Sequence, residues 1–226
     1  MSSSPLPARR SFTAELDQLH LQVELMAVRV DEALERMREV LETGDEVAAG
    51  RALAADDNID AMNVSLTERC YDLLRREAPV ASDLRFVVSV LRVLSELERI
   101  GDLALRVAKL APDHALIASS VETFDILCVM AGQAIDRYRT ALRAWATTDL
   151  DLATELAVGP RTMDLLTERL MTEVLRLKGA NAVPIAVKTF SAGQALDRIA
   201  DHAAIIGARL RYLITGDPNH LVSEVR

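Results

Sequence analysis

Residues 98–102 read Glu-Arg-Ile-Gly-Asp, and residues 197–201 read Asp-Arg-Ile-Ala-Asp. Each stretch has an acid, then Arg-Ile, then a small residue and a second acid, and each lies late in a segment with helical periodicity. Side chains four residues apart lie above one another on one helix face, so each stretch presents two adjacent carboxylates. The repetition predicts two copies of one structural unit, each with an acidic site.

The composition favours a helical globular protein. Of the 226 residues, 50% are hydrophobic and only 4% are aromatic, which favours helix over sheet in a chain long enough for a sizeable core. The net charge of -8 disfavours non-specific binding to nucleic acid or to an anionic membrane. Because no apolar run reaches the length of a membrane span and no secretory signal is visible, we expect a cytoplasmic protein with no membrane insertion and no nucleic-acid partner.

Apolar residues at alternating steps of three and four predict a first helix over residues 11–43, capped by Ser11 and ended by Gly44. Similar signals predict further helices over residues 45–77, 82–111, 120–146, 149–178 and 181–216. The Gly159-Pro160 step should kink the fifth of these helices. Long amphipathic helices joined by short turns pack antiparallel, so we predict an all-α chain of two tandem antiparallel three-helix bundles.

The bundles are expected at residues 11–111 and 118–217, with a boundary in the segment between them. Residues 1–10 should then be a flexible N-terminal tail, and residues 218–226 a C-terminal tail. Asp45 and Asp149 are expected to cap the second helix of each unit.

The acids of the third predicted helix fall in columns that also hold apolar residues. Residues seven apart lie in one row along a helix. One such row contains Leu84, Leu91, Glu98 and Leu105, and the row beside it contains Val88, Ser95 and Asp102. We therefore expect Glu98 and Asp102 on or beside the buried seam. An unpaired carboxylate is costly there and needs an arginine, a shared proton or a metal.

The second predicted helix carries matching acids, Asp56 and Asp60. If it packs beside the third, four carboxylates can converge. Ligands that are all oxygen suit Mg, Mn or Fe and are unsuited to a structural zinc site. The alternative interpretation is that the acids only form ion pairs, with Arg99, Arg106 or Lys109.

The second unit keeps fewer acids. Asp164, Asp197 and Asp201 are present, but Pro160 and Arg161 occupy the places that match Asp56 and Asp57. We therefore predict weaker or absent metal binding in the second bundle.

Four arginines also repeat by sevens on the third predicted helix: Arg85, Arg92, Arg99 and Arg106. The favoured interpretation is a solvated face neutralised by Glu77, Glu96 and Glu98. The alternative is a docking surface for an acidic partner.

No catalytic residues are predicted, because the sequence has no HExxH, GxSxG, Walker A or GxGxxG motif. His202 adjoins Asp201 and is interpreted as an ordinary helix histidine, with a role beside a metal site as the alternative.

The chain resembles the PhoU family, the accessory and regulatory proteins of bacterial phosphate uptake, and especially its actinobacterial members. The resemblance covers about residues 11–217. It rests on Asp56-Asp-Asn-Ile-Asp60, Ala78-Pro-Val-Ala-Ser-Asp-Leu-Arg85, Leu97-Glu-Arg-Ile-Gly-Asp102 and Asp197-Arg-Ile-Ala-Asp-His202.

The resemblance implies two PhoU-type three-helix bundles, metal sites on the acidic motifs and no catalysis. Carried over, the first site comprises Asp56, Asp60, Glu98 and Asp102, and the second comprises Asp164, Asp197 and Asp201. The candidate ions are Fe, Mg, Mn and Zn. The second motif departs from the family pattern because Asp197 replaces the usual Glu and Pro160 and Arg161 replace acids.

The resemblance also implies a role and partners. Family members act as negative regulators of phosphate-starvation signalling and of phosphate uptake. The implied partners are a sensor histidine kinase of the phosphate response and the ATPase of a phosphate ABC importer. Some relatives also form a homodimer.

Two other functions fit the residues. One is a carboxylate-bridged metalloenzyme, such as a hydrolase or oxidase, because clustered acids that bind two metals can activate water. Such sites usually include histidine ligands and a pocket, which these motifs do not show. The other is a helical scaffold whose acids are only structural.

Overall fold

The computed structural model describes residues 7–77, 79, 81–158 and 162–225. The first half contains α1 (Pro7–Thr43), α2 (Glu46–Glu77) and α3 (Ala81–Ala108), followed by the short η1 (Ala111–Asp113) and α4 (His114–Ile117). The second half contains α5 (Val121–Thr147), α6 (Leu150–Val158), α7 (Thr162–Arg176), α8 (Ala182–Thr215) and η2 (Pro218–Val225). No strand is present in these residues, so the all-α prediction is confirmed.

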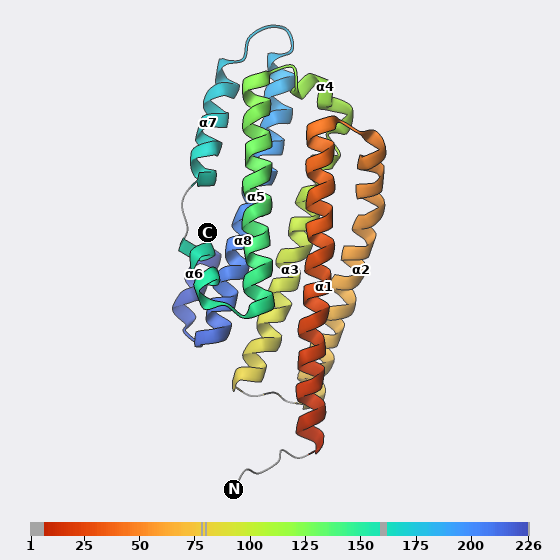
Figure 1. The fold of residues 1–226 in the computed structure, drawn as a ribbon, viewed down its shortest axis with the longest axis vertical. Helices are drawn as coiled ribbons and strands as arrows, with labels where there is room; N and C mark the ends of the chain where they lie inside the picture. The colour runs from red at the N-terminus through yellow and green to blue at the C-terminus, as the bar shows by residue number, and fades with distance from the viewer. Residues whose placement is uncertain (1–6, 78, 80, 159–161, 226) are drawn as a thin grey trace.

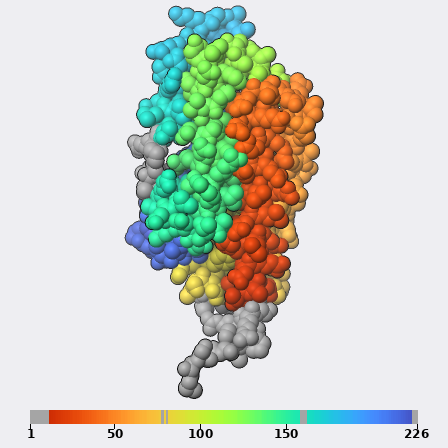
Figure 2. Space-filling model, viewed as in Figure 1, coloured from red at the N-terminus to blue at the C-terminus, as the bar shows by residue number. Residues whose placement is uncertain are grey.

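The long helices run along one axis and alternate in direction, while α6 and α7 follow one another in the same direction (Figure 1). Helices α1, α2 and α3 pack together in the first half, and α5, α6 and α7 pack with α8 in the second. The two halves lie side by side, with α3 against α8 and α1 against α5. Figure 2 shows α5 beside the upper part of α1, while the N-terminal part of α1 extends below α5. The predicted pair of three-helix bundles is therefore present.

One continuous core joins the two halves. Buried residues from both halves belong to a single cluster, which includes Leu97 and Ile100 of α3 and Leu196 and Ile199 of α8. The Tyr138 hydroxyl donates a hydrogen bond across the halves to the carbonyl of Ala27, at 2.6 Å. The core therefore does not separate the chain into independent units, and the division at residues 11–111 and 118–217 stays a prediction.

Equivalent aspartates cap α2 and α6. The Asp45 carboxylate accepts hydrogen bonds from the amides two and three residues further on, at 2.7 and 3.1 Å. Asp149 does the same at 2.8 and 2.9 Å. Gly44 follows α1 and Gly216 follows α8 with φ of 70° and 73°, a left-handed backbone that favours glycine. These predicted helix ends are confirmed.

Two predictions about the chain ends differ from the structure. The first helix begins at Pro7 instead of Ser11, since proline suits a helix start, so residues 7–10 are not a tail. Residues 218–225 form η2, which packs on α8. The predicted fifth helix is represented by α6 and α7, and the kink predicted at Gly159-Pro160 lies outside the described residues. Residues 1–6, 159–161 and 226 lie outside the described part of the chain.

The predicted seam of α3 is buried only at Leu105, and its other residues are half-buried or exposed. Leu84 and Val88 are each 42% exposed, whereas α3 buries another face, which includes Val90 and Leu97. Because α3 contacts α1, α2 and α8, apolar residues occur on more than one of its faces, and the spacing by sevens did not identify the buried one. Glu98 and Asp102 therefore lie at the rim of the core.

No helix in the described part of the chain is long and apolar enough to cross a membrane.

Candidate metal centre

Helices α2 and α3 bring three predicted site residues together. One carboxylate oxygen each from Asp60, Glu98 and Asp102 lies within 4.8 Å of the other two. Glu98 is half-buried, while Asp60 and Asp102 are exposed. Both α3 acids therefore lie beside the core and not within it, and the cluster is partly open to solvent.

The small residue of the motif permits close packing beside the cluster. A Cβ atom at Gly101 would lie 3.3 Å from Cδ1 of Ile59 and 4.0 Å from a carboxylate oxygen of Asp56. A larger side chain there would push α2 away from α3. Gly101 therefore lets α2 bring its acids close to those of α3.

Two carboxylates of this region, Asp56 and Glu98, hold their protons more tightly than isolated acids do. Burial raises the pKa of Asp56, and the neighbouring charges of Asp60 and Asp102 raise it further. Burial also raises the pKa of Glu98, with Asp102 and Asp60 as the next causes, while Arg99 opposes the shift. The cluster thus carries more negative charge than its cationic neighbours offset.

This donor set fits a hard divalent cation. Carboxylate oxygens from two helices face a common point, and their mutual repulsion is the feature that a cation would relieve. The residues that would hold it are Asp60, Glu98 and Asp102, with Asp56 beside them.

The second group of acids is arranged differently. Asp164 belongs to the first turn of α7, and Asp197 and Asp201 lie on α8. In the part of the chain that is described, these three do not form a group with the close oxygen spacing of the first cluster. Pro160 and Arg161, which replace acids here, lie outside the described residues.

Cationic neighbours accompany the second group. Burial raises the pKa of Asp197, and Asp201 raises it further. Burial also raises the pKa of Asp201, but His202, Arg137 and Arg198 oppose that shift. Part of the negative charge is therefore offset by the protein's own side chains.

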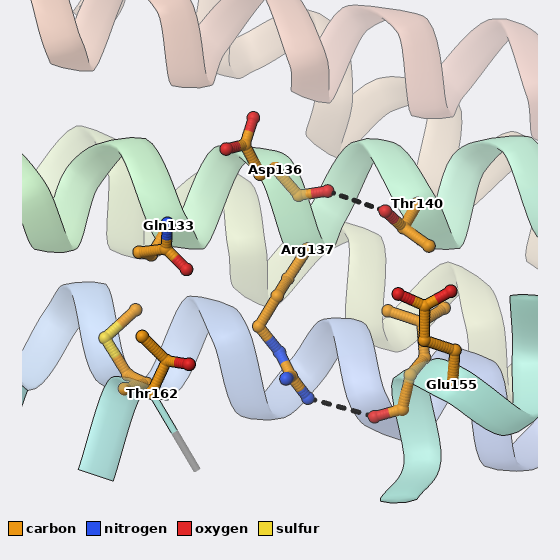
Figure 3. Close-up of a pocket in the computed structure, with 8 residues that line it drawn as sticks. Gln133, Asp136, Arg137, Thr140, Glu155 and Thr162 are labelled. Carbon is orange, nitrogen blue, oxygen red and sulfur yellow. Dashed lines mark hydrogen bonds between the residues drawn. The ribbon is translucent and has the colours of Figure 1, made fainter. Parts of the chain in front are cut away.

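Arg137 also lines a cavity of about 170 Å³ between α5, α6 and α7 (Figure 3). Its guanidinium donates a hydrogen bond to the carbonyl of Leu156, at 2.9 Å. Asp136, Glu155 and Thr162 line the same cavity. With the arginine already bonded to α6, the arrangement ties α5 to the end of that helix.

The arginine row of α3 is partly paired within the chain. Nη2 of Arg92 lies 3.1 Å from Oε1 of Glu96, and Nη1 of Arg99 lies 4.0 Å from the same atom. A Cβ atom at Gly216, which follows α8, would lie 3.5 Å from Cζ of Arg85. Arg106 is exposed. Glu96 is therefore one of the acids that neutralise this arginine row. The side chain of Glu77, another predicted partner, lies outside the described part of the structure.

Sequence reasoning missed a buried contact between a histidine and a carboxylate of the two halves. Glu96 of α3 is fully buried and His202 of α8 is 6% exposed. Nδ1 of His202 and Oε2 of Glu96 are 2.5 Å apart. The available signal was position, since Glu96 lies three residues after Val93 and four before Ile100, in a column of buried apolar residues.

Comparisons with known proteins agree with this architecture. The PhoU domain profile matches residues 23–111 and 127–210, one match in each half. The PhoU homolog 1 of Thermotoga maritima, a phosphate-specific transport system accessory protein, is 29% identical over 207 residues, which cover 91% of this chain and 89% of the relative. The accessory protein PhoU of Escherichia coli is 25% identical over 212 residues, covering 91% and 86%.

Solved structures give the same result. The crystal structure of PhoU from Pseudomonas aeruginosa has a TM-score of 0.85 at 29% identity, covering 91% of this chain and all of that one. The phosphate transport system regulatory protein PhoU from Streptococcus pneumoniae has a TM-score of 0.79 at 25% identity, covering 91% and 98%.

These relatives are named as accessory and regulatory proteins, which supports regulation over the metalloenzyme alternative. Since the domain profile matches most of both halves, the chain belongs to the PhoU family.

Proposed function

We propose that this chain is a regulatory accessory protein of phosphate transport. It represses phosphate-starvation signalling and phosphate uptake when phosphate is plentiful. The observation that carries the proposal is the match of both halves to the PhoU domain, together with relatives named for the phosphate-specific transport system.

Its proposed partners are a sensor histidine kinase and the ATPase of a phosphate ABC importer. The proposed location is the cytoplasm, where an importer ATPase binds ATP. The acidic chain, at a net charge of -8, suits protein partners better than nucleic acid.

We further propose that Asp56, Asp60, Glu98 and Asp102 bind a divalent cation, with Mg, Mn, Fe and Zn as candidates. The close oxygens and the raised pKa values of Asp56 and Glu98 support this proposal. When bound, the ion supplies the positive charge that the cluster lacks. The protein's own contribution is to hold α2 beside α3. The second set, Asp164, Asp197 and Asp201, binds more weakly.

Gene deletion tests the regulatory role. We expect a phosphate-starvation reporter to become active in high phosphate when the gene and any paralogue are deleted, and expression of this chain to restore repression. A reporter that stays fully repressed in the deletion strain would overturn the proposal.

Affinity purification tests the partners. The tagged chain should recover the kinase or the importer ATPase from phosphate-replete cells and lose it on starvation. Recovery of neither protein would contradict the proposed partners. Light scattering of the purified chain tests the further expectation of a homodimer.

A further inference from the structure

The two halves align closely enough to be compared residue by residue. Aligning their sequences on the two helix caps, Asp45 and Asp149, places buried residues of α1 against buried residues of α5. The matched pairs include Met26 with Met130, Leu34 with Tyr138 and Leu41 with Trp145. In this alignment the partly buried Ala33 of α1 corresponds to Arg137 of α5. The second half therefore has a guanidinium where the first half has a methyl group.

Equivalent cavities lie beside these two positions. In the first half, a cavity of about 160 Å³ between α1 and α2 has two cationic residues in its wall, Arg29 and Arg36. Both are bound to the same glutamate of α1, at 3.1 and 3.4 Å. In the second half, the cavity of about 170 Å³ has the uncharged Gln133 and Thr140 at the positions of these arginines, and its cation is Arg137.

Arg137 is held at the C-terminal end of α6. Its Nη2 donates a hydrogen bond to the carbonyl of Leu156, at 2.9 Å, and α6 ends at Val158. In a continuing helix that carbonyl would accept from the residue four positions further on, which here is Pro160 and has no N–H. The C-terminus of a helix also favours a nearby cation. The proline that replaces an acid of the first half thus leaves a carbonyl for the arginine to bind.

The acids in the cavity wall do not use up the charge of Arg137. Asp136 and Glu155 are exposed, and within the described residues neither forms an ion pair with the guanidinium. Figure 3 shows Asp136 pointing away from it. The Nε atom of Arg137 is buried and makes no hydrogen bond in the part of the chain that is described. The guanidinium is therefore available to the acids of α8.

The charge of Arg137 acts on Asp201 of α8. Burial raises the pKa of Asp201, and His202, Arg137 and Arg198 oppose that shift. His202 is already paired with Glu96 of α3. Arg198 belongs to the repeated Arg-Ile motif, so the first half has its counterpart. Arg137 is therefore the cation that distinguishes the second group of acids from the first cluster.

We propose that Arg137 is a built-in cation of the second acid set, which comprises Asp164, Asp197 and Asp201, and that it keeps a divalent ion from binding there. The first half has no charge at the equivalent position, so its cluster takes its cation from solution. The proposal deepens the proposed metal binding and rests on it, because it explains why the second set binds more weakly: a fixed guanidinium repels a divalent cation.

Removing the charge of Arg137 should create a metal site. The background for this test is the double variant Asp60→Asn with Glu98→Gln, in which the first cluster is disabled. Adding Arg137→Gln keeps an N–H donor at this position and removes the charge. We expect the dissociation constant for Mn²⁺, measured from the electron paramagnetic resonance signal of the free ion, to fall by about tenfold or more.

Three matched variants in the same background serve as controls. Arg137→Lys keeps the positive charge and should bind Mn²⁺ as weakly as the background does. Arg143→Gln removes an exposed arginine from the same helix and should also leave the binding unchanged. Asp201→Asn combined with Arg137→Gln should abolish the gain, because the new site loses a ligand.

Several results would overturn the proposal. These are no gain of Mn²⁺ binding in Arg137→Gln, an equal gain in Arg143→Gln, or a gain that survives Asp201→Asn. Tight Mn²⁺ binding by the background that is abolished by Asp201→Asn would also overturn it, since Arg137 is then present and does not exclude the ion. This last test needs no substitution at Arg137, so it holds even where Arg137→Gln does not fold.

The same measurement separates this inference from the proposed metal centre. A wild-type chain that binds no Mn²⁺ would contradict a metal site at the first cluster, whereas a gain in Arg137→Gln would still support the role of Arg137. Tight Mn²⁺ binding by the wild type with no gain in Arg137→Gln would support the first cluster and overturn the role of Arg137.

Discussion

The two halves of the molecule share their helix caps but differ in their acid clusters. Asp45 and Asp149 make matching hydrogen bonds, whereas the oxygens of Asp60, Glu98 and Asp102 come together without an equivalent group in the described residues of the second half. The caps determine where a helix begins, so the fold depends on them. The carboxylates lie at the rim of the core, so one cluster could diverge while the fold persisted.

A second difference lies where the halves meet. Aligning Glu98 with Asp197 places Glu96 against Ala195 and Leu103 against His202. Ala195 and Leu103 are 1% and 4% exposed. The repeat thus has the polar residues Glu96 and His202 at one pair of positions and the apolar residues Ala195 and Leu103 at the equivalent pair. The ionic pair is not required by the architecture and belongs to one side of the repeat only.

The largest expected effect comes from breaking that pair on one side. The variant His202→Leu leaves the Glu96 carboxylate buried with Arg92 as its remaining close partner, and should lower the free energy of unfolding by about 3 kcal/mol. Urea denaturation measures the loss. The double variant Glu96→Ala with His202→Leu copies the apolar counterpart and should recover most of it. A single variant as stable as wild type would show that the pair contributes nothing to stability.

Metal addition distinguishes the two acid clusters. At a Mn²⁺ concentration one hundred times the dissociation constant, binding to the folded state adds about 2.7 kcal/mol of stability. For a chain of this size that raises Tm by roughly 5–10 °C. The double variant Asp60→Asn with Glu98→Gln should lose this shift, while Asp197→Asn should keep it. An equal loss in both variants would contradict the difference between the clusters.

A smaller effect is expected where the second half packs more closely than the first. Gly207 aligns with the buried Ala108, yet a Cβ atom at Gly207 would lie 2.8 Å from Cβ of Leu156 and 3.0 Å from the carbonyl oxygen of Ala153. Gly207→Ala should therefore destabilise the protein by about 1–2 kcal/mol, because crowding of α6 outweighs the gain in helix propensity. Thermal unfolding tests this, and a higher Tm than wild type would contradict it.

The sequence predicted the elements that depend on local chemistry. Asp45, Asp149, Gly44 and Gly216 each act through backbone atoms a few residues away, so their roles can be read from the chain itself. The proximity of Asp60 to the acids of α3 was also predictable from the sequence, because helices joined by a short turn pack side by side.

The buried face of α3 and the Glu96–His202 pair could not be predicted in the same way. Both depend on α8, which lies far away in the sequence and packs against α3 through the contact between halves. A local pattern shows that α3 has apolar residues on several faces but not which neighbour covers each one. Glu96 looked like one more surface acid because its partner was not yet located.

The smallest expected effect concerns pH in the metal-free protein. The pKa values of Asp56 and Glu98 are raised in the folded state, first by burial and then by their acidic neighbours. The folded state therefore holds these protons more tightly than the unfolded state, so the stability gained from protonation is lost as the pH rises through the raised values. Glu98→Gln removes one negative charge from the cluster and should be the more stable protein at pH 7, by less than about 1 kcal/mol.

The measurement is the difference in free energy of unfolding between Glu98→Gln and the wild type, followed across pH in the presence of a chelator. It should shrink as the pH falls towards about 4, the ordinary range of a glutamate, because Glu98 of the wild type then becomes protonated as well. A difference that does not change with pH would mean that repulsion within the cluster is already balanced by Arg99 and Lys109. The first cluster would then resemble the second, whose charge is partly offset by its own side chains, and a bound cation would have little repulsion left to relieve.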